Sequence, residues 1–350
     1  MNEYYTNNYT KYCKDVKFDF FDSYDFLFIF GRSISVVIIP IDIFGMYCII
    51  KKTPKKLKTK GCLMYLQSLI IFLDILLTLC MTPYVYFPTC SGFTIGIFRS
   101  IGFPMIFQCF IAIVGISTLN FAVPIIFENR HNILVRSNFK ITRKCSRILF
   151  YLFNVTLPFF CQLPVFLHIP DQIPAALEVL KRIPCPTIEY FQQPIFTLTL
   201  KYDVAMFSLS TTLFVAFIQI LFFSIHSFYH LRKISNFASV KTQKLQKAVF
   251  SALSLQISVS TAILILPIFY FWYAFQFNYY RQGFTNISFL MIASHGCFAT
   301  VTMLFCHKNY REYISSFFCK KKPRIDGLHS NTPSFQRTNI SVQHVEPIRF

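Results

Sequence analysis

Seven long apolar runs divide this chain, and a polar segment separates each run from the next. A helix needs about 20 residues to cross ~30 Å of hydrocarbon. Lipid offers the backbone no hydrogen bonds, so spanning segments without a closed barrel must be helices. The pattern therefore predicts an all-α fold, a bundle of seven transmembrane helices. The runs cover residues 26–50, 62–87, 96–127, 146–167, 201–229, 249–275 and 284–306, and the third is long enough to tilt or to extend past the bilayer.

Lys and Arg residues are concentrated in alternate polar segments, which predicts the orientation of the bundle. The segments 51–61, 128–147, 230–248 and 307–350 hold 25 of the 34 Lys and Arg residues. The segments on the other side hold six. Because cytoplasmic loops carry an excess of positive charge, we expect an extracellular N-terminus and a cytoplasmic C-terminus. That arrangement requires an odd number of spans.

The composition indicates a membrane protein, and its two terminal segments differ in their predicted character. Only 14% of the residues are charged, against about a quarter in soluble domains. The net charge of +19 lies in short loop blocks, which argues against a nucleic-acid partner. We interpret residues 1–25 as an extracellular segment without a cleaved signal peptide. Residues 307–350 are polar and predict a largely disordered cytoplasmic tail.

Three ionisable side chains fall inside the predicted spans, where a charge is costly and usually functional. Asp42 lies in the first span, Asp74 near the middle of the second and His295 in the middle of the seventh. In a bundle they could meet around one polar cavity and hold an ion or water. They could also form a switch between two packing arrangements. The alternative is a buried hydrogen-bonded pair that fixes helix packing.

The predicted topology places Cys13, Cys90 and Cys185 outside the membrane, where disulfides form. We predict a Cys90–Cys185 bridge; free thiols or a bridge through Cys13 are the alternatives. Asn8 begins the one extracellular glycosylation sequon that is far from the bilayer. At the cytoplasmic edge, Cys306 and Cys319 are candidates for palmitoylation.

Motifs for catalysis are absent from the sequence: it holds no HExxH, GxSxG or P-loop pattern. We therefore expect no enzymatic activity, no cofactor and no metal site. The four-residue spacing of His226 and His230 could bind a metal, but histidines at the membrane interface are the commoner explanation.

An ordered series of short motifs resembles the nematode serpentine chemoreceptors of class h, with the sister class i close to it. The third run ends in Phe127-Glu128-Asn129-Arg130, and the second carries Leu73-Asp74 followed by Pro83-Tyr84-Val85-Tyr86-Phe87-Pro88. Further pieces are Gln162-Leu163-Pro164, Ile169-Pro170-Asp171-Gln172, Pro184-Cys185, His295-Gly296 and His307-Lys308-Asn309-Tyr310-Arg311. The series extends from the second run to the start of the tail, which is most of the chain.

This resemblance implies a G-protein-coupled receptor of a chemosensory neuron, located in the plasma membrane of the sensory cilium. Its partners would be a small extracellular ligand, a heterotrimeric G protein and the lipid bilayer. Glu128, Asn129 and Arg130 would form the coupling motif, with Arg130 as the counterpart of the arginine in the Asp-Arg-Tyr motif. The acid here stands two residues before the arginine instead of one, and His131 replaces the tyrosine.

Depth in the outer half of the bundle is the only guide to ligand contacts. It selects Gln108, Phe207, Thr211, Tyr270, Tyr273 and Met291 as pocket candidates. A transporter or ligand-gated channel is the alternative function, although the odd number of spans and the lack of an internal repeat oppose it. A retinal-based light receptor is disfavoured because the seventh run contains no lysine.

Overall fold

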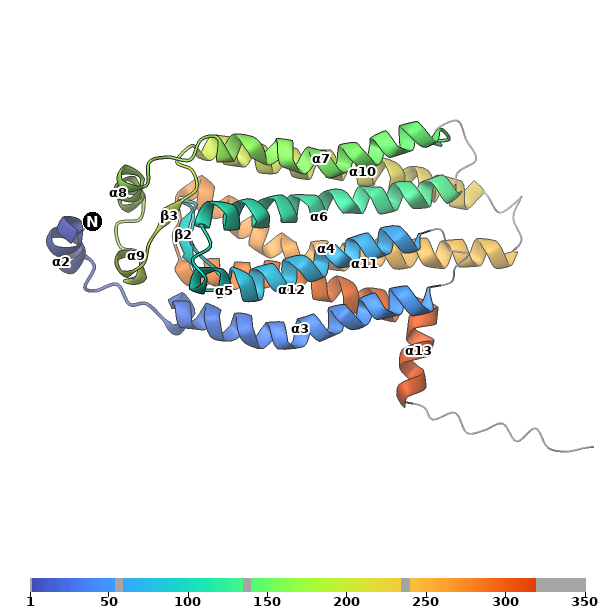
Figure 1. Ribbon diagram of the computed structural model, residues 1–350, viewed down its shortest axis with the longest axis horizontal. Coiled ribbons are helices and arrows are strands. Elements are labelled where there is room, and N and C mark those ends of the chain that lie inside the picture. The colour runs from blue at the N-terminus through green and yellow to red at the C-terminus, as the bar shows by residue number, and fades with distance from the viewer. Residues whose placement is uncertain (1, 54–58, 135–139, 234–239, 319–350) are drawn as a thin grey trace, which may run out of the picture.

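The computed structural model describes residues 2–53, 59–134, 140–233 and 240–318 (Figure 1). Within these ranges, seven helices are long and apolar enough to cross a membrane, which confirms the predicted bundle. They are α3 (Tyr24–Lys52), α4 (Lys60–Ile75) with its π-helical continuation to Cys80, α6 (Met105–Leu134), α7 (Lys144–Phe166), α10 (Tyr202–Lys233), α11 (Val240–Phe277) and α12 (Gln282–Cys306).

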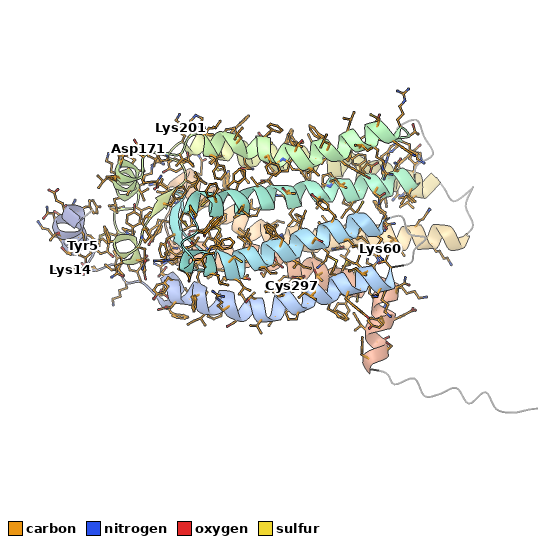
Figure 2. The ribbon with its side chains drawn as sticks, in the orientation of Figure 1. Tyr5, Lys14, Lys60, Asp171, Lys201 and Cys297 are labelled. Atoms are coloured by element: carbon orange, nitrogen blue, oxygen red, sulfur yellow. A yellow bond between two sulfur atoms is a disulfide. The ribbon has the colours of Figure 1, made fainter. Side chains whose placement is uncertain are left out.

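The two ends of the bundle are built differently, as Figure 1 shows. One end, called here the sheet end, carries α1 (Asn2–Tyr4), α2 (Thr10–Tyr12), α8 (Gln172–Arg182), α9 (Glu189–Gln192) and a small sheet. The other, the α13 end, carries α13 (Lys308–Phe318), which turns away from the bundle axis. Lys14 and Lys201 lie toward the sheet end and Lys60 toward the α13 end (Figure 2). The N-terminal segment and α13 thus lie at opposite ends, as an odd number of spans requires.

The second span is shorter than predicted, because the chain leaves the helix before residue 87. After a π-helical turn at Leu76–Cys80, β1 (Pro83–Tyr86) pairs antiparallel with β2 (Ser91–Thr94), which pairs with β3 (Phe196–Thr197). Pro83 has no N–H for a helical hydrogen bond. A Cβ atom on Gly92 would lie 2.2 Å from the carbonyl oxygen of Tyr84, so this hairpin requires glycine there.

The third span is also displaced, and the predicted helix over 96–127 is wrong at both ends. Residues Ile97–Ser100 form the separate short helix α5, and Gly102 adopts a φ of 70° before Pro104. Helix α6 then continues to Leu134, so Glu128, Asn129 and Arg130 lie within the helix. The predicted disordered tail begins instead with α13; its remainder lies outside the described residues.

Apolar side chains fill the bundle and also cover much of its outside. Buried Leu66, Leu73, Ala122 and Leu253 belong to one core cluster. Large side chains on the outward faces, such as Phe214, are more than half exposed, which suits contact with lipid tails. Small residues bring helices close together: a Cβ atom on Gly115 would lie 2.9 Å from a side-chain methyl carbon of Leu73.

Candidate functional site

A buried polar cluster joins α3, α4 and α12 inside the bundle, in the half nearer the α13 end. The hydroxyl of Thr300 donates to Oδ1 of Asp42 at 2.5 Å, and Nε2 of Gln67 donates to Thr300 Oγ1 at 2.9 Å. Asp42 and Thr300 are completely buried, and Gln67 is 1% exposed. A Cβ atom on Gly45 would lie 2.5 Å from Cγ2 of Thr300, so a glycine allows this close approach of α3 and α12. The cluster therefore fixes three helices relative to one another.

Asp74 extends this cluster toward the sheet end. Its carboxyl group lies within hydrogen-bonding reach of the Asp42 carboxyl group. Among the described residues, neither Asp74 oxygen has a donor, and Oδ2 of Asp42 also lacks one. Two carboxylates facing each other in a low-dielectric interior repel, whereas a shared proton gives them a hydrogen bond. The geometry therefore favours an acid pair that holds a proton.

His295 lies beside the acid pair without bonding to it. Its Nδ1 faces the carbonyl oxygen of Ile292 at 2.5 Å, and its side chain is buried. The next residue, Gly296, is the closer neighbour: a Cβ atom there would lie 2.9 Å from Asp74 Oδ2. The structure thus brings Asp42 and Asp74 together and places His295 at their edge. Sequence reasoning missed Gln67 and Thr300, although polar residues inside apolar runs were the available signal.

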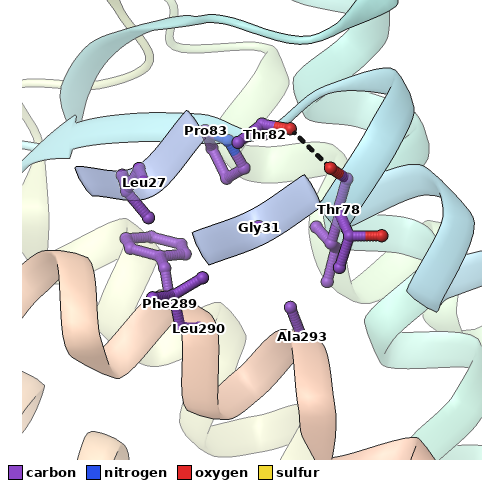
Figure 3. A pocket seen from close by; sticks show the side chains of 9 residues that line it. Leu27, Gly31, Thr78, Thr82, Pro83, Phe289, Leu290 and Ala293 are labelled. Atoms are coloured by element: carbon purple, nitrogen blue, oxygen red, sulfur yellow. Dashed lines mark hydrogen bonds between the residues drawn. The ribbon is translucent and has the colours of Figure 1, made fainter. Parts of the chain in front are cut away.

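A small cavity begins one helical turn from Asp74, between α3 and α12 (Figure 3). Its volume is about 10 Å³, room for about one water molecule. Thr78 lines it and donates its hydroxyl to the Asp74 carbonyl oxygen at 2.6 Å, and Thr82 donates to the Thr78 carbonyl oxygen. The other lining residues are Leu27, Gly31, Leu77, Pro83, Phe289, Leu290 and Ala293. The cavity therefore lies one helical turn from Asp74, and Thr78 is bonded to the backbone of Asp74 rather than to its carboxyl group.

The predicted coupling motif lies at the α13 end, where its acid is bound by the next helix. Glu128 is fully buried, and its Oε1 lies 3.2 Å from Nε of Arg147 in α7. The hydroxyl of Tyr151 donates to Glu128 Oε2 at 2.8 Å, and Arg147 also donates to Asn129 Oδ1 at 2.8 Å. This network holds α6 against α7.

Arg130 is not part of that ion pair. It is 8% exposed, and its Nε has no hydrogen-bond partner in the part of the chain that the structure describes. Its charge acts on His307, at the end of α12, and on Tyr310 in α13. The hydroxyls of Tyr310 and Thr53 lie 2.6 Å apart in the buried joint between α13 and α3. Arg130 therefore faces the root of α13.

Three histidines meet at the same end. Nε2 of His131 lies 2.6 Å from Nδ1 of His226 in α10, and the rings of His226 and His230 are 4.7 Å apart. The sequence showed the spacing of His226 and His230 but not their contact with α6. In the described ranges, no group of three or more His, Cys, Asp or Glu side chains has a geometry that could hold a metal ion.

The predicted pocket residues do not converge on one site. Phe207 is 73% exposed and Tyr273 is 39% exposed, so both lie on the outward surface, which corrects their assignment to a pocket. Gln108 is buried and donates to the Phe103 carbonyl oxygen at 2.6 Å. Tyr270 donates to the Arg281 carbonyl oxygen at 3.0 Å. The remaining members, Thr211 and Met291, are half-buried. Depth along a helix does not show which way a side chain points.

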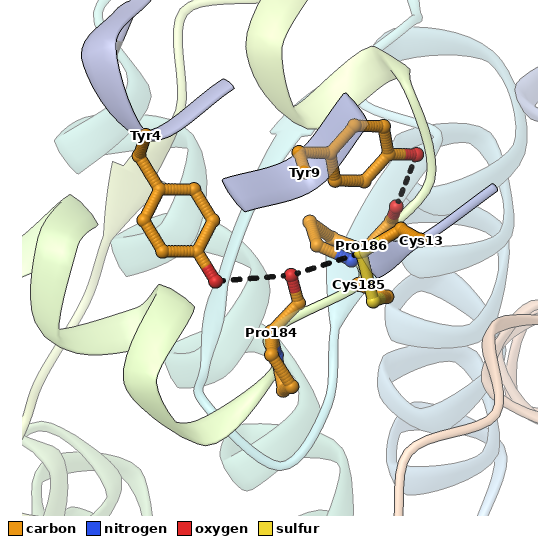
Figure 4. The surroundings of a disulfide bond; sticks show 6 residues. All are labelled: Tyr4, Tyr9, Cys13, Pro184, Cys185 and Pro186. Atoms are coloured by element: carbon orange, nitrogen blue, oxygen red, sulfur yellow. Dashed lines mark hydrogen bonds between the residues drawn. A yellow bond between two sulfur atoms is a disulfide. The ribbon is translucent and has the colours of Figure 1, made fainter. Parts of the chain in front are cut away.

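A disulfide ties the N-terminal segment to the loop before α9, and it is not the predicted one. Cys13 bonds Cys185 with an S–S distance of 2.00 Å (Figure 4). Tyr4 and Tyr9 donate their hydroxyls to the carbonyl oxygens of Pro184 and Pro186, on either side of Cys185. These bonds hold the N-terminal segment over the sheet end.

Cys90 is a free thiol, so the predicted Cys90–Cys185 bridge is wrong. It lies in the turn between β1 and β2 with a φ of 47°. Burial, followed by the neighbouring Cys109, raises the pKa of the Cys90 thiol to about 12. The Cys90 thiol thus lies beside Cys109 of α6, whereas Cys185 is bonded to the N-terminal segment at the sheet end.

The predicted modification sites have different surroundings. Asn8 is exposed in the N-terminal segment. Cys306 is a half-buried free thiol at the end of α12, and Cys319 lies outside the described residues.

Two comparisons with known proteins agree with this architecture. The family model described as "Serpentine type 7TM GPCR chemoreceptor Srh" matches residues 22–320. "Serpentine receptor class H-72" of Caenorhabditis elegans is 25% identical to the chain over 330 residues, covering 93% of this chain and 94% of that protein.

Proposed function

The chain belongs to the Srh family of serpentine seven-transmembrane chemoreceptors, and from this premise we propose that it detects an extracellular small molecule and activates a heterotrimeric G protein. It is a multi-pass membrane protein of a receptor family, as its seven apolar helices require. The sheet end would face outward and the α13 end the cytoplasm, since the segments rich in Lys and Arg join helices at the α13 end. We expect this receptor in the sensory cilium, which a fluorescent fusion would test.

The observation that carries coupling is the arrangement around Arg130. Glu128 is paired with Arg147, and the charge of Arg130 acts on His307 at the root of α13. A movement of α13 or α12 would bring this charge to the surface, where an acidic partner could bind it. Ligand binding at the sheet end would favour one of two bundle packings, and the acid pair of Asp42 and Asp74 is the proposed polar switch between them.

Two assays test the proposal in the same cells. Epitope tags at the two ends should give an accessible N-terminus and a C-terminus that is stained only after permeabilisation. G-protein activation is then recorded against a panel of odorants and secreted metabolites. Arg130→Ala should abolish the response to an activating compound, whereas Arg143→Ala, which removes an exposed charge just before α7, should preserve it.

Two outcomes would contradict the proposal. A hidden N-terminal tag would reverse the topology. Ion or solute flux that continues without any G protein would favour the alternative, a transporter or channel.

A further inference from the structure

Helix α8 lies at the sheet end of the bundle, just beyond the end of α7 (Figure 1). Residues 167–171 connect the two helices. The span Lys144–Phe166 has 23 residues, which at 1.5 Å per residue is enough to cross ~30 Å of hydrocarbon. The chain therefore leaves α7 at the surface of the membrane, and α8 begins close to that surface.

Contacts at both ends of α8 hold it in one orientation. At its start, Nε2 of Gln172 donates to the Thr197 carbonyl oxygen at 3.2 Å, and Oε1 of Gln172 accepts from the Thr197 N–H at 2.7 Å. At its end, the guanidinium of Arg182 lies 4.2 Å from the centre of the Tyr202 ring. Because the helix cannot rotate without breaking these contacts, its outward face is a defined surface.

One side of α8 is buried against the bundle. Its residues are small or apolar: Ala175, Ala176, Val179 and Leu180. Tyr190 donates its hydroxyl to the carbonyl oxygen of Ala176 at 2.9 Å, which fastens this side further. Packing against the bundle explains why these positions are apolar.

Two large apolar residues of α8 lie outside the buried side. Ile173 is 83% exposed and Leu177 is 42% exposed. They are four residues apart, so they lie on the same side of the helix, and we call them the apolar strip. At about 100° per residue, Glu178 and Arg182 lie on average about 140° away from the strip around the helix axis. The residues between the two sides are Pro174 and Lys181.

The charged side of α8 suits contact with water. Glu178 and Lys181 form an ion pair at 2.8 Å, with both side chains exposed. The outward face is thus apolar along one side and charged along the other. A helix of this kind lies in the plane of the membrane surface, with its apolar residues toward the acyl chains.

The apolar strip follows directly on the lipid-facing surface of α7. Phe160 is 68% exposed near the end of that helix, and Leu167, the first residue after it, is 70% exposed. Lipid covers these side chains in a spanning helix. Exposed apolar side chains on both sides of the turn at 167–171 indicate that the same lipid layer also covers the strip.

We propose that α8 docks on the lipid bilayer, with Ile173 and Leu177 inserted at the boundary between headgroups and acyl chains. Docking would hold the loop that carries Cys185 at a fixed depth. Through the disulfide to Cys13, it would also position the N-terminal segment. The inference requires the membrane-spanning bundle but not G-protein coupling, so it would remain if the proposed signalling were absent.

Tryptophan fluorescence of the full-length receptor in phosphatidylcholine nanodiscs tests this contact. Trp272 is the single tryptophan of the chain, so Trp272→Phe provides a background without tryptophan emission. In that background, Ile173→Trp should give blue-shifted emission. It should lose about half of its intensity in lipid brominated near the headgroup and less in lipid brominated near the chain ends, because interfacial helices insert only about 5–10 Å.

Two further variants complete the test. Leu177→Trp is an independent probe of the apolar strip and should behave like Ile173→Trp. Glu178→Trp is the matched control on the charged side, and its emission should stay red-shifted and insensitive to bromine. A Cys13–Cys185 peptide in a non-reduced digest of each variant shows that the loop is folded.

Three results would overturn the proposal. One is equal emission and equal quenching for the strip variants and the control, which would place the strip in water. Another is blue-shifted emission that bromine does not quench, which would show that protein, such as a second copy of the receptor, covers the strip. The last is stronger quenching by bromine near the chain ends, which would place α8 inside the hydrocarbon.

Discussion

Nε of Arg147 lies 3.2 Å from Oε1 of Glu128, so the acid of the Glu128-Asn129-Arg130 motif is paired with the neighbouring helix and not within its own motif. Residues two apart in a helix point in different directions, which separates Glu128 from Arg130. In this receptor the acid joins α6 to α7, and the arginine is oriented toward α13.

Removing one member of this ion pair should destabilise the receptor. Arg147→Gln leaves the fully buried Glu128 carboxylate without its cation and should cost about 2–3 kcal/mol. The value lies below that of a fully buried pair because Arg147 is one-third exposed. Unfolding of the purified receptor measures it. The double variant Arg147→Gln, Glu128→Gln should lose less free energy of unfolding than the two single variants lose together. Strict additivity would show that the two groups do not interact.

The disulfide should depend on Cys13 and Cys185 but not on Cys90. Either Cys13→Ser or Cys185→Ser should release the N-terminal segment, with a loss of about 2–4 kcal/mol in its docking. Limited proteolysis of residues 1–25 measures this release. Cys90→Ser is the matched control and should leave the segment protected; a non-reduced peptide containing Cys90 and Cys185 would contradict the prediction.

The acid pair should tolerate an amide at one position. Asp74→Asn supplies a donor to Asp42 without an added proton, so the free energy of unfolding should stay within about 1 kcal/mol of the unmodified value. Asp74→Leu removes the donor and leaves Asp42 Oδ2 unpaired, at a cost of about 1–3 kcal/mol. Thermal unfolding in detergent compares the two. Equal losses would rule out a shared proton.

Docking of α13 should weaken in acid. Burial, followed by the charge of Arg130, lowers the pKa of His307 to about 4 from an ordinary value of about 6.5. Above pH 6.5 the imidazole is neutral in both the docked and the released state. Between pH 6.5 and 4, His307 binds a proton when α13 is released but stays neutral when α13 is docked. The equilibrium constant for docking therefore falls by up to about tenfold per pH unit.

Amide hydrogen exchange in α13, corrected for its intrinsic pH dependence, measures this effect. His307→Gln cannot bind the proton, so its protection should be constant over the same interval. A parallel loss of protection in the variant would assign the effect to another group.

The sequence alone determined the elements and the family. Lipid forces the backbone of an apolar run of about 20 residues into a helix, so seven runs specified seven helices. The ordered motifs from Leu73-Asp74 to His307-Lys308 indicated class h, and the family comparison confirms it. Both inferences are independent of how one helix is rotated relative to the next.

Only the tertiary structure decided the partners of individual side chains. The rotational position of α6 brings Glu128 to Arg147. The N-terminal segment crosses the sheet end, which brings Cys13 to Cys185. Phe207 and Gln219 occupy the same apolar run, yet one faces outward and the other has a buried amide. Hydropathy indicates whether a segment lies in the membrane. In this bundle the apolar residues lie on every face of the helices, so rotation and contact come from packing alone.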